Sequence, residues 1–198
     1  MRIAVLDDYF NVSQRLADWS PLKGRAETTV FRKPFANAED AAGSLADFEI
    51  IVGMRERTPF PAGLLRRLPK LKLLITTGRR NSSFDIEAAH AQGVTVCCTG
   101  SAGNATAELA IGLMIALMRD IPGQFASMRQ GGWQTRLGSD LSGKTLGLLG
   151  LGRVGGAVAA AAKALRMEVI AWSQNLTDER AAEHHARRVE KDELFRRS

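Results

Sequence analysis

Cysteine is almost absent from the sequence. Of the 198 residues only two are cysteines, Cys97 and Cys98, and they are adjacent at the end of an apolar run. Neighbouring cysteines have neither the spacing of metal ligands nor the geometry of an ordinary disulfide. We therefore interpret both as unpaired core or loop thiols of a protein that works in the reducing cytoplasm, with no bound metal.

Long hydrophobic runs are also lacking. The chain turns acidic after a short apolar run at Met1–Asp8, which excludes the apolar region and cleavage site of a secretory signal. The most apolar later stretch, Ala105–Met118, contains Glu108 and is shorter than the ~20 residues that cross a bilayer. The sequence therefore predicts a buried strand and a buried helix here, and no membrane partner.

Clusters of basic residues interleaved with aromatic residues are missing too, although the formal net charge is +6 and the isoelectric point is near 9.8. The arginines occur in scattered pairs, and acidic residues separate most of them: Arg66-Arg67, Arg79-Arg80, Arg187-Arg188 and Arg196-Arg197. This pattern favours a solvated surface over a nucleic-acid interface.

The composition, 45% hydrophobic and 24% charged, is that of an ordinary globular protein and excludes a disordered or fibrous one. The first hundred residues alternate short β-branched runs with amphipathic stretches, which predicts βαβ units and a parallel sheet. The candidate strands are Ile3–Leu6, Thr28–Phe31, Ile50–Val52, Leu71–Thr76 and Val94–Cys97. Five such strands would form a small doubly wound domain.

Two helices can be bounded by their end signals. One is expected from Pro61, a residue tolerated in a first turn, to about Leu68. Another is expected to start after Ser83 or Asp85, either of which could cap it, and to end at Gly93.

The pattern changes after residue 104. The helix Ala105–Arg119 is apolar nearly all round, which predicts burial on several sides, between domains or across a dimer interface. Pro122 should mark a break before a second helix that runs towards Arg129. A loop rich in glycine follows, and a new strand is expected at Thr145–Leu149.

The most informative segment follows this strand. Gly150, Gly152 and Gly155 have the spacing GxGxxG between an apolar strand and an alanine-rich helix, expected from Val154 to about Leu165. Such glycines permit a tight turn, close approach of a pyrophosphate, and close packing of helix on strand. The helix would direct its N-terminal N–H groups at the pyrophosphate. We interpret the segment as a dinucleotide-binding turn and not as a purely structural one.

A second strand is expected at Glu168–Trp172, and the residues that end it should distinguish NAD from NADP. An acid there would bond the ribose 2′-hydroxyl and repel a 2′-phosphate. This chain has Ser173, Gln174 and Asn175 instead, with no acid before Asp178, and Arg180 could assist a phosphate. Both NAD and NADP therefore stay open.

The run from Gly131-Gly132-Trp133 through Leu141-Ser142-Gly143-Lys144-Thr145 to Gly155 resembles the D-isomer-specific 2-hydroxyacid dehydrogenases, the phosphoglycerate dehydrogenase-like group. The run Thr77–Asn81 with Phe84-Asp85, and Ala105–Glu108, fit that family's substrate loop and interdomain helix. The resemblance implies an α/β fold: a flavodoxin-like substrate domain over residues 1–101 and the first part of a Rossmann domain over residues 102–198. It also implies a homodimer through the Ala105–Arg119 region, and a small 2-hydroxy or 2-keto acid as substrate.

Site residues can be carried over from the family by position. Gly78, Arg79 and Arg80 would offer backbone amides to the substrate carboxylate, with Arg55 nearby. For the cofactor, the resemblance implies Thr106 near the nicotinamide, and Arg153 and Val154 within the glycine turn. The sequence departs from the family at Ala102, where many members have asparagine.

The catalytic arginine, glutamate and histidine of the family come from later strands and loops, so we expect none of them in this chain. His90 lies in a predicted helix, and His184 and His185 lie on an expected exposed helix, so none matches the catalytic histidine. The resemblance thus implies a C-terminally truncated chain, with two strands of a six-stranded sheet, that binds cofactor poorly and is inactive alone. The alternatives are a non-enzymatic NAD(H)-binding or interaction protein, and a two-domain scaffold without a ligand.

Overall fold

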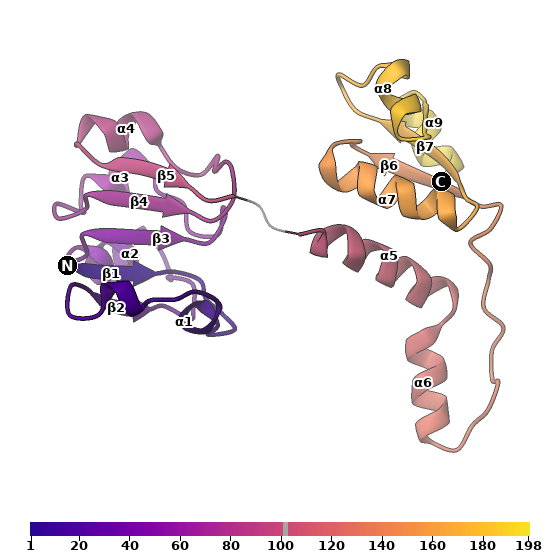
Figure 1. Cartoon of the computed structure of the whole chain (residues 1–198), viewed down its shortest axis with the longest axis horizontal. Helices are drawn as coiled ribbons and strands as arrows, with labels where there is room; N and C mark the ends of the chain where they lie inside the picture. The colour runs from indigo at the N-terminus through magenta and orange to yellow at the C-terminus, as the bar shows by residue number, and fades with distance from the viewer. Residues whose placement is uncertain (101–102) are drawn as a thin grey trace. The chain divides into compact units, whose positions relative to one another are not determined.

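A computed structural model describes residues 1–100 and 103–198 of the chain. It divides into two compact units, Met1–Ala102 and Gly103–Ser198. Each unit has its own parallel sheet and is described by itself below (Figure 1). Ala102, where the family resemblance leads us to look for asparagine, lies outside the described residues.

The first unit is a five-stranded parallel sheet in the order β2-β1-β3-β4-β5 (Figure 1). This is the flavodoxin-like order, so the predicted fold is confirmed. In chain order, its elements are β1 (Arg2–Val5), α1 (Ser13–Leu16), a short 3₁₀ turn (Ser20–Leu22), β2 (Glu27–Val30), α2 (Ala38–Leu45), β3 (Ile50–Gly53), α3 (Ala62–Leu65), β4 (Leu73–Thr76), α4 (Ile86–Ala91) and β5 (Thr95–Cys98).

The core of this unit lies between the sheet and the helices that pack on it. Ala4, Ile51 and Leu74 come from neighbouring strands and are fully buried, as is Leu45 of α2. Parallel strands are covered by crossover helices, and this is why their sequences read as continuous apolar runs.

The ends of two helices differ from the expectation. Pro61 is the residue before α3, not its first residue, and the helix ends at Leu65 instead of Leu68. For α4, Asp85 is the cap, because its carboxylate accepts a hydrogen bond from the N–H of Ala88. Ser83 is instead bonded to the side chain of Asn81.

The second unit begins with two helices and continues with alternating strands and helices. Its sheet is parallel, in the order β6-β7-β8. The elements are α5 (Ala105–Met118), α6 (Ile121–Arg129), β6 (Thr145–Leu149), α7 (Arg153–Ala164), β7 (Glu168–Trp172), α8 (Asp178–Glu183), β8 (Arg187–Arg188) and α9 (Lys191–Arg197). The expectation of two strands was wrong: β8 adds a third, through a register of only two pairs, Ile170 with Arg187 and Ala171 with Arg188.

The predicted burial of α5 on several sides is not seen within its unit. Only Ala107 of this helix is buried, and Leu113 and Leu117 are 61% and 80% exposed. The break before α6 falls at Asp120, which has a left-handed backbone (φ 48°), and Pro122 lies inside the first turn of α6 instead of before it.

In the described part of the chain, no single helix is long and apolar enough to span a membrane. The helices α5 and α6 reach that length and composition only when taken together, and they are bent by 61° at the break between them (Figure 1).

Candidate functional site

The glycine turn lies between β6 and α7, at the carboxyl end of the parallel strands. Gly150 adopts a left-handed φ of 103°, which turns the chain off β6. Its N–H donates to the carbonyl of Trp172, at 2.8 Å, and so ties the turn to the end of β7. Gly152 precedes the first residue of α7, and no side chain caps this helix. The turn therefore presents uncapped N–H groups at the positive end of a twelve-residue helix.

Each glycine of the turn meets a different constraint. A Cβ on Gly155 would overlap the carbonyl oxygen of Gly150, so this position needs glycine for the turn to close against the helix. A Cβ on Gly152 would meet no atom within 4 Å. The structure therefore gives no packing reason for glycine at Gly152, whereas close approach of a ligand does give one.

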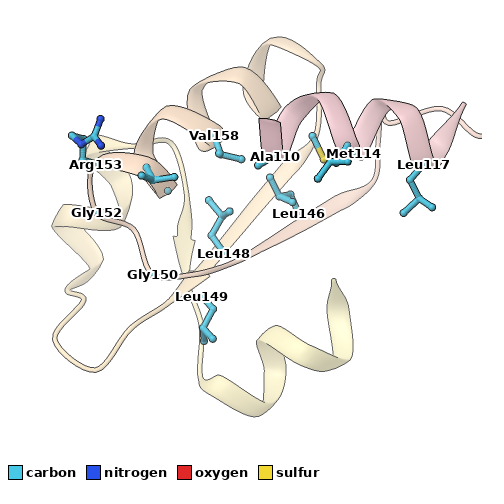
Figure 2. Close-up of a pocket in the computed structure, with 13 residues that line it drawn as sticks. Ala110, Met114, Leu117, Leu146, Leu148, Leu149, Gly150, Gly152, Arg153 and Val158 are labelled. Atoms are coloured by element: carbon cyan, nitrogen blue, oxygen red, sulfur yellow. The ribbon is translucent and has the colours of Figure 1, made fainter. Parts of the chain in front are cut away.

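A cavity of about 790 Å³ opens beside this turn. Gly150, Gly152 and Arg153 line one part of it, and apolar side chains of β6, α5 and α7 line the rest. Figure 2 shows Leu146, Leu148 and Val158 pointing towards α5, whose Ala110 and Met114 face them.

Three further residues expected at the cofactor site differ in their placement. Arg153 donates from its guanidinium to the carbonyl of Gly103, at 2.9 Å. Val154 lines the cavity, whereas Thr106, in the first turn of α5, is exposed and does not line it.

The residues after β7 lie at the same edge of the sheet as the glycine turn. The register pairs Leu149 with Trp172, so Gly150 and Ser173 follow neighbouring strand ends. Ser173 is half-buried, and Gln174 and Asn175 are exposed. Arg180 is exposed on α8. This arrangement places neutral polar side chains where a ribose would lie in a dinucleotide-binding fold.

In the first unit, the expected substrate loop follows β4 and approaches Arg55. Arg55 has a left-handed backbone (φ 57°), and a Cβ on Gly78 would overlap its guanidinium. The N–H of Gly78 donates to the hydroxyl of Thr99, at 2.9 Å, so this amide is already engaged. In the part of the chain that the structure describes, the backbone N–H groups of Arg79 and Arg80 have no protein acceptor.

Asn81 is a residue that the sequence reasoning placed in this loop without a role. Its buried amide donates to the carbonyl of Arg55 at 2.6 Å and to the hydroxyl of Thr76 at 2.9 Å. Its carbonyl oxygen accepts from the N–H and the hydroxyl of Ser83. Asn81 therefore clamps the Arg55 loop to the segment after β4. An asparagine in the loop between a predicted strand and a predicted helix was the only signal in the sequence.

The histidines lie away from the glycine turn or serve packing. His90 is exposed on α4. The expected exposed helix at His184 and His185 was wrong: α8 ends at Glu183, and the His184 ring packs closely against Gly156 of α7. Among residues 1–100 and 103–198, no group of three or more His, Cys, Asp or Glu side chains could hold a metal ion.

Residues 111–198 match the family model described as D-isomer specific 2-hydroxyacid dehydrogenase, NAD binding domain. The chain is 32% identical over 169 residues to D-3-phosphoglycerate dehydrogenase of Rattus norvegicus, which covers 84% of this chain and 32% of that protein. It is 36% identical over 161 residues to D-3-phosphoglycerate dehydrogenase of Archaeoglobus fulgidus, covering 79% and 30%.

The chain belongs to the D-isomer-specific 2-hydroxyacid dehydrogenase family.

Solved structures of this family agree with the fold. A putative D-3-phosphoglycerate dehydrogenase from Ralstonia solanacearum matches 100% of this chain and 62% of its own, with 37% identity and a TM-score of 0.85. A phosphoglycerate oxidoreductase from Vibrio cholerae o395 matches 100% and 64%, with 33% identity and a TM-score of 0.87.

The family also indicates the cofactor. The matched model is that of an NAD-binding domain, and the glycine turn lies within the matched residues. The cofactor is therefore NAD(H). The chain spans about a third of the length of the curated relatives that it matches, 32% of the rat protein.

Proposed function

We propose that this chain forms part of an NAD(P)-dependent oxidoreductase that transfers hydride between the nicotinamide and a small 2-hydroxy or 2-keto acid. The observation that carries the proposal is the turn at Gly150–Gly155, with uncapped N–H groups and open space over Gly152. Those N–H groups would hold the pyrophosphate of the cofactor. Bound NAD(H) supplies or accepts the hydride, and the protein supplies position and charge.

The thermal stability of the chain with millimolar NADH tests this proposal. We expect NADH to raise the melting temperature of the wild-type chain and to leave that of Gly152→Ala unchanged, because the added methyl occupies the approach of the pyrophosphate. Gly43→Ala is the matched control, since Gly43 lies in α2 and a Cβ there also meets open space. An equal shift in all three chains would refute binding at the turn.

For the substrate, we propose that Arg55, Arg79 and Arg80 and the amides of the Arg79-Arg80 segment bind the carboxylate. The support is the exposed pair of guanidinium groups and the two N–H groups that have no acceptor within the described residues. Gly78 would contribute through its backbone shape, because its N–H is bonded to Thr99.

We further propose that the site tolerates NADPH as well as NADH, with Arg180 assisting the 2′-phosphate. The neutral residues Ser173, Gln174 and Asn175 support this, because no carboxylate there would repel the phosphate. Ser173→Asp should shift the affinity ratio towards NADH by about tenfold, the ratio that ~1.4 kcal/mol of repulsion produces. Gln130→Asp, at the residue that follows α6, adds the same charge elsewhere and should leave the ratio unchanged. Equal ratios in all chains would contradict this role for Ser173.

These 198 residues are proposed to lack hydride-transfer activity on their own. The two histidines of the second unit support this, because His185 is exposed outside the cavity beside the turn and His184 packs against Gly156. The competing proposal, an NAD(H)-binding protein without chemistry, rests on the same placement. We expect no oxidation of NADH with a panel of 2-keto acids; turnover at an enzyme-like rate would refute the proposal.

We also propose an oligomeric state and a cellular setting for the protein. The exposed apolar side chains of α5 fit a homodimer interface over Ala105–Arg119. The two free cysteines fit a reducing, cytoplasmic setting.

A further inference from the structure

A second cavity, of about 430 Å³, lies at the edge of the sheet in the first unit. Cys97 and Cys98 at the end of β5 line it, together with Arg79, Arg80 and His90. Both thiols are unpaired, as expected, but they are exposed in a strand, so the expected placement in the core or in a loop was wrong. Among the described residues β5 pairs with β4 alone, so it is an edge strand of its sheet.

The two cysteines cannot readily bond to each other. Adjacent Cα atoms are about 3.8 Å apart, which is shorter than the ~4.4 Å that an unstrained disulfide requires. Because the chain of 198 residues has no third cysteine, neither thiol has a partner for an internal disulfide. A small molecule attached to either sulfur would therefore not be displaced by another thiol of this chain.

Two positively charged side chains, Arg79 and Arg80, also line the cavity. No ion pair among residues 1–100 and 103–198 involves Arg79 or Arg80, and both side chains are exposed. By contrast, Arg67, in the other arginine pair of this unit, bonds Glu39 at 3.3 Å. Two guanidinium groups beside an exposed thiol, without an ion-pair partner among the described residues, raise the local concentration of anions and the rate at which they arrive.

We propose that Cys97 and Cys98 form a modification site for small, carboxylate-bearing disulfides such as glutathione disulfide. The protein thiolate attacks one sulfur of the reagent, the S–S bond of the reagent breaks, and a mixed disulfide forms on the protein. The displaced sulfur leaves with the electron pair as a thiolate and takes a proton from water. Arg79 and Arg80 hold the carboxylates of the reagent during the attack and afterwards those of the adduct.

The adduct would occupy the arginines that the proposed function assigns to the substrate carboxylate. Modification would then reduce substrate binding, and this consequence rests on the proposed function. The modification itself does not, so it is tested by its own chemistry.

The test compares the rates at which the folded chain reacts with glutathione disulfide, which is negatively charged, and with cystamine, which is positively charged. Mass spectrometry follows the adducts, and Cys97→Ser and Cys98→Ser assign them. We expect Arg79→Ala/Arg80→Ala to lower the ratio of the two rates by about tenfold. Arg66→Ala/Arg67→Ala, the matched pair outside the cavity, should leave the ratio unchanged.

Salt provides a measurement that needs no variant. In the wild-type chain, raising the ionic strength should lower the rate with glutathione disulfide and raise the rate with cystamine, because both reagents are charged. A rate ratio that depends neither on salt nor on Arg79 and Arg80, or a folded chain that forms no adduct, would overturn the proposal.

Discussion

At the scale of single residues, glycines that share a motif have separate tasks, and the structure distinguishes them. Gly155 closes the turn against the Gly150 carbonyl, whereas Gly152 has open space where a side chain would be. The spacing in the sequence predicts the turn but treats the two positions alike. Only the three-dimensional contacts assign one to packing and the other to ligand approach.

This difference can be measured with two substitutions. Gly155→Ala should lower the free energy of unfolding by about 1–3 kcal/mol, because the methyl group forces the turn away from α7. Gly152→Ala should leave it within about 0.5 kcal/mol of the wild-type value. Urea unfolding of both variants checks this, and equal losses would contradict the division of tasks.

Asn81 is a second residue whose role depends on its surroundings. Asn81→Ala removes the donor to Arg55 and Thr76 and the acceptor for Ser83. Because the site is buried, we expect a loss of about 1–3 kcal/mol in the free energy of unfolding. Asn175→Ala, at an exposed loop position, is the control and should change little. A loss no larger than that of the control would show that the clamp is weak.

Asp8 links stability to pH. Burial raises the pKa of Asp8, but hydrogen bonds from the N–H groups of Ser13 and Val12, at 2.8 and 3.0 Å, bring it below the usual range. A lowered pKa in the folded state gives stability that is present above the unfolded pKa of about 3.9 and is lost as pH falls through the folded value. Thermal unfolding from neutral to acidic pH should show this loss, and Asp8→Asn should reduce its size. If Asp8→Asn lost as much thermal stability at acidic pH as the wild-type chain, Asp8 would be excluded as a cause of that loss.

At the scale of elements, the sequence predicts strands and helices best where an apolar pattern is long and has clear end signals. The strands Thr145–Leu149 and Glu168–Trp172 are confirmed to the residue, because each apolar run begins next to a charged or polar residue and ends before Gly150 or Ser173. β8 could not be predicted, since Arg187 and Arg188 have no apolar pattern and pair only because β7 offers a free edge. His184 was misplaced for a similar reason, because its contact with Gly156 joins the residue that follows α8 to α7 across the fold.

The exposed leucines of α5 lead to a testable prediction. These leucines were expected to be buried, and within their unit they are exposed. If they form a homodimer interface, Leu113→Glu/Leu117→Glu should convert a dimer to a monomer, because buried carboxylates oppose association. Light scattering measures the mass, and Leu16→Glu, at a leucine that is 79% exposed on α1, is the control. A dimer that survives in the double variant would exclude this helix as the interface.

At the scale of the whole molecule, the parallel sheets and the glycine turn could be anticipated from the sequence, whereas the detail of the sites could not. The alternation of strands and helices predicts a parallel sheet with right-handed crossovers, whereas the particular order β2-β1-β3-β4-β5 was expected only from the family resemblance. The cavity beside the glycine turn depends on how α5 packs on β6 and α7. The cavity lined by Cys97 and Cys98 depends on the position of β5 at the edge of its sheet. Neither arrangement can be deduced from spacing along the chain.

The central claim is that the N–H groups of the Gly150–Gly155 turn hold the cofactor pyrophosphate, and a titration of the ¹⁵N-labelled chain with NAD⁺ tests it most directly. We predict that the amide resonances of Gly152, Arg153, Val154 and Gly155 shift progressively, and that Gly152→Ala abolishes these shifts while the rest of its spectrum is preserved. Amide resonances of the turn that do not shift at saturating NAD⁺, or shifts confined to other parts of the chain, would contradict the account.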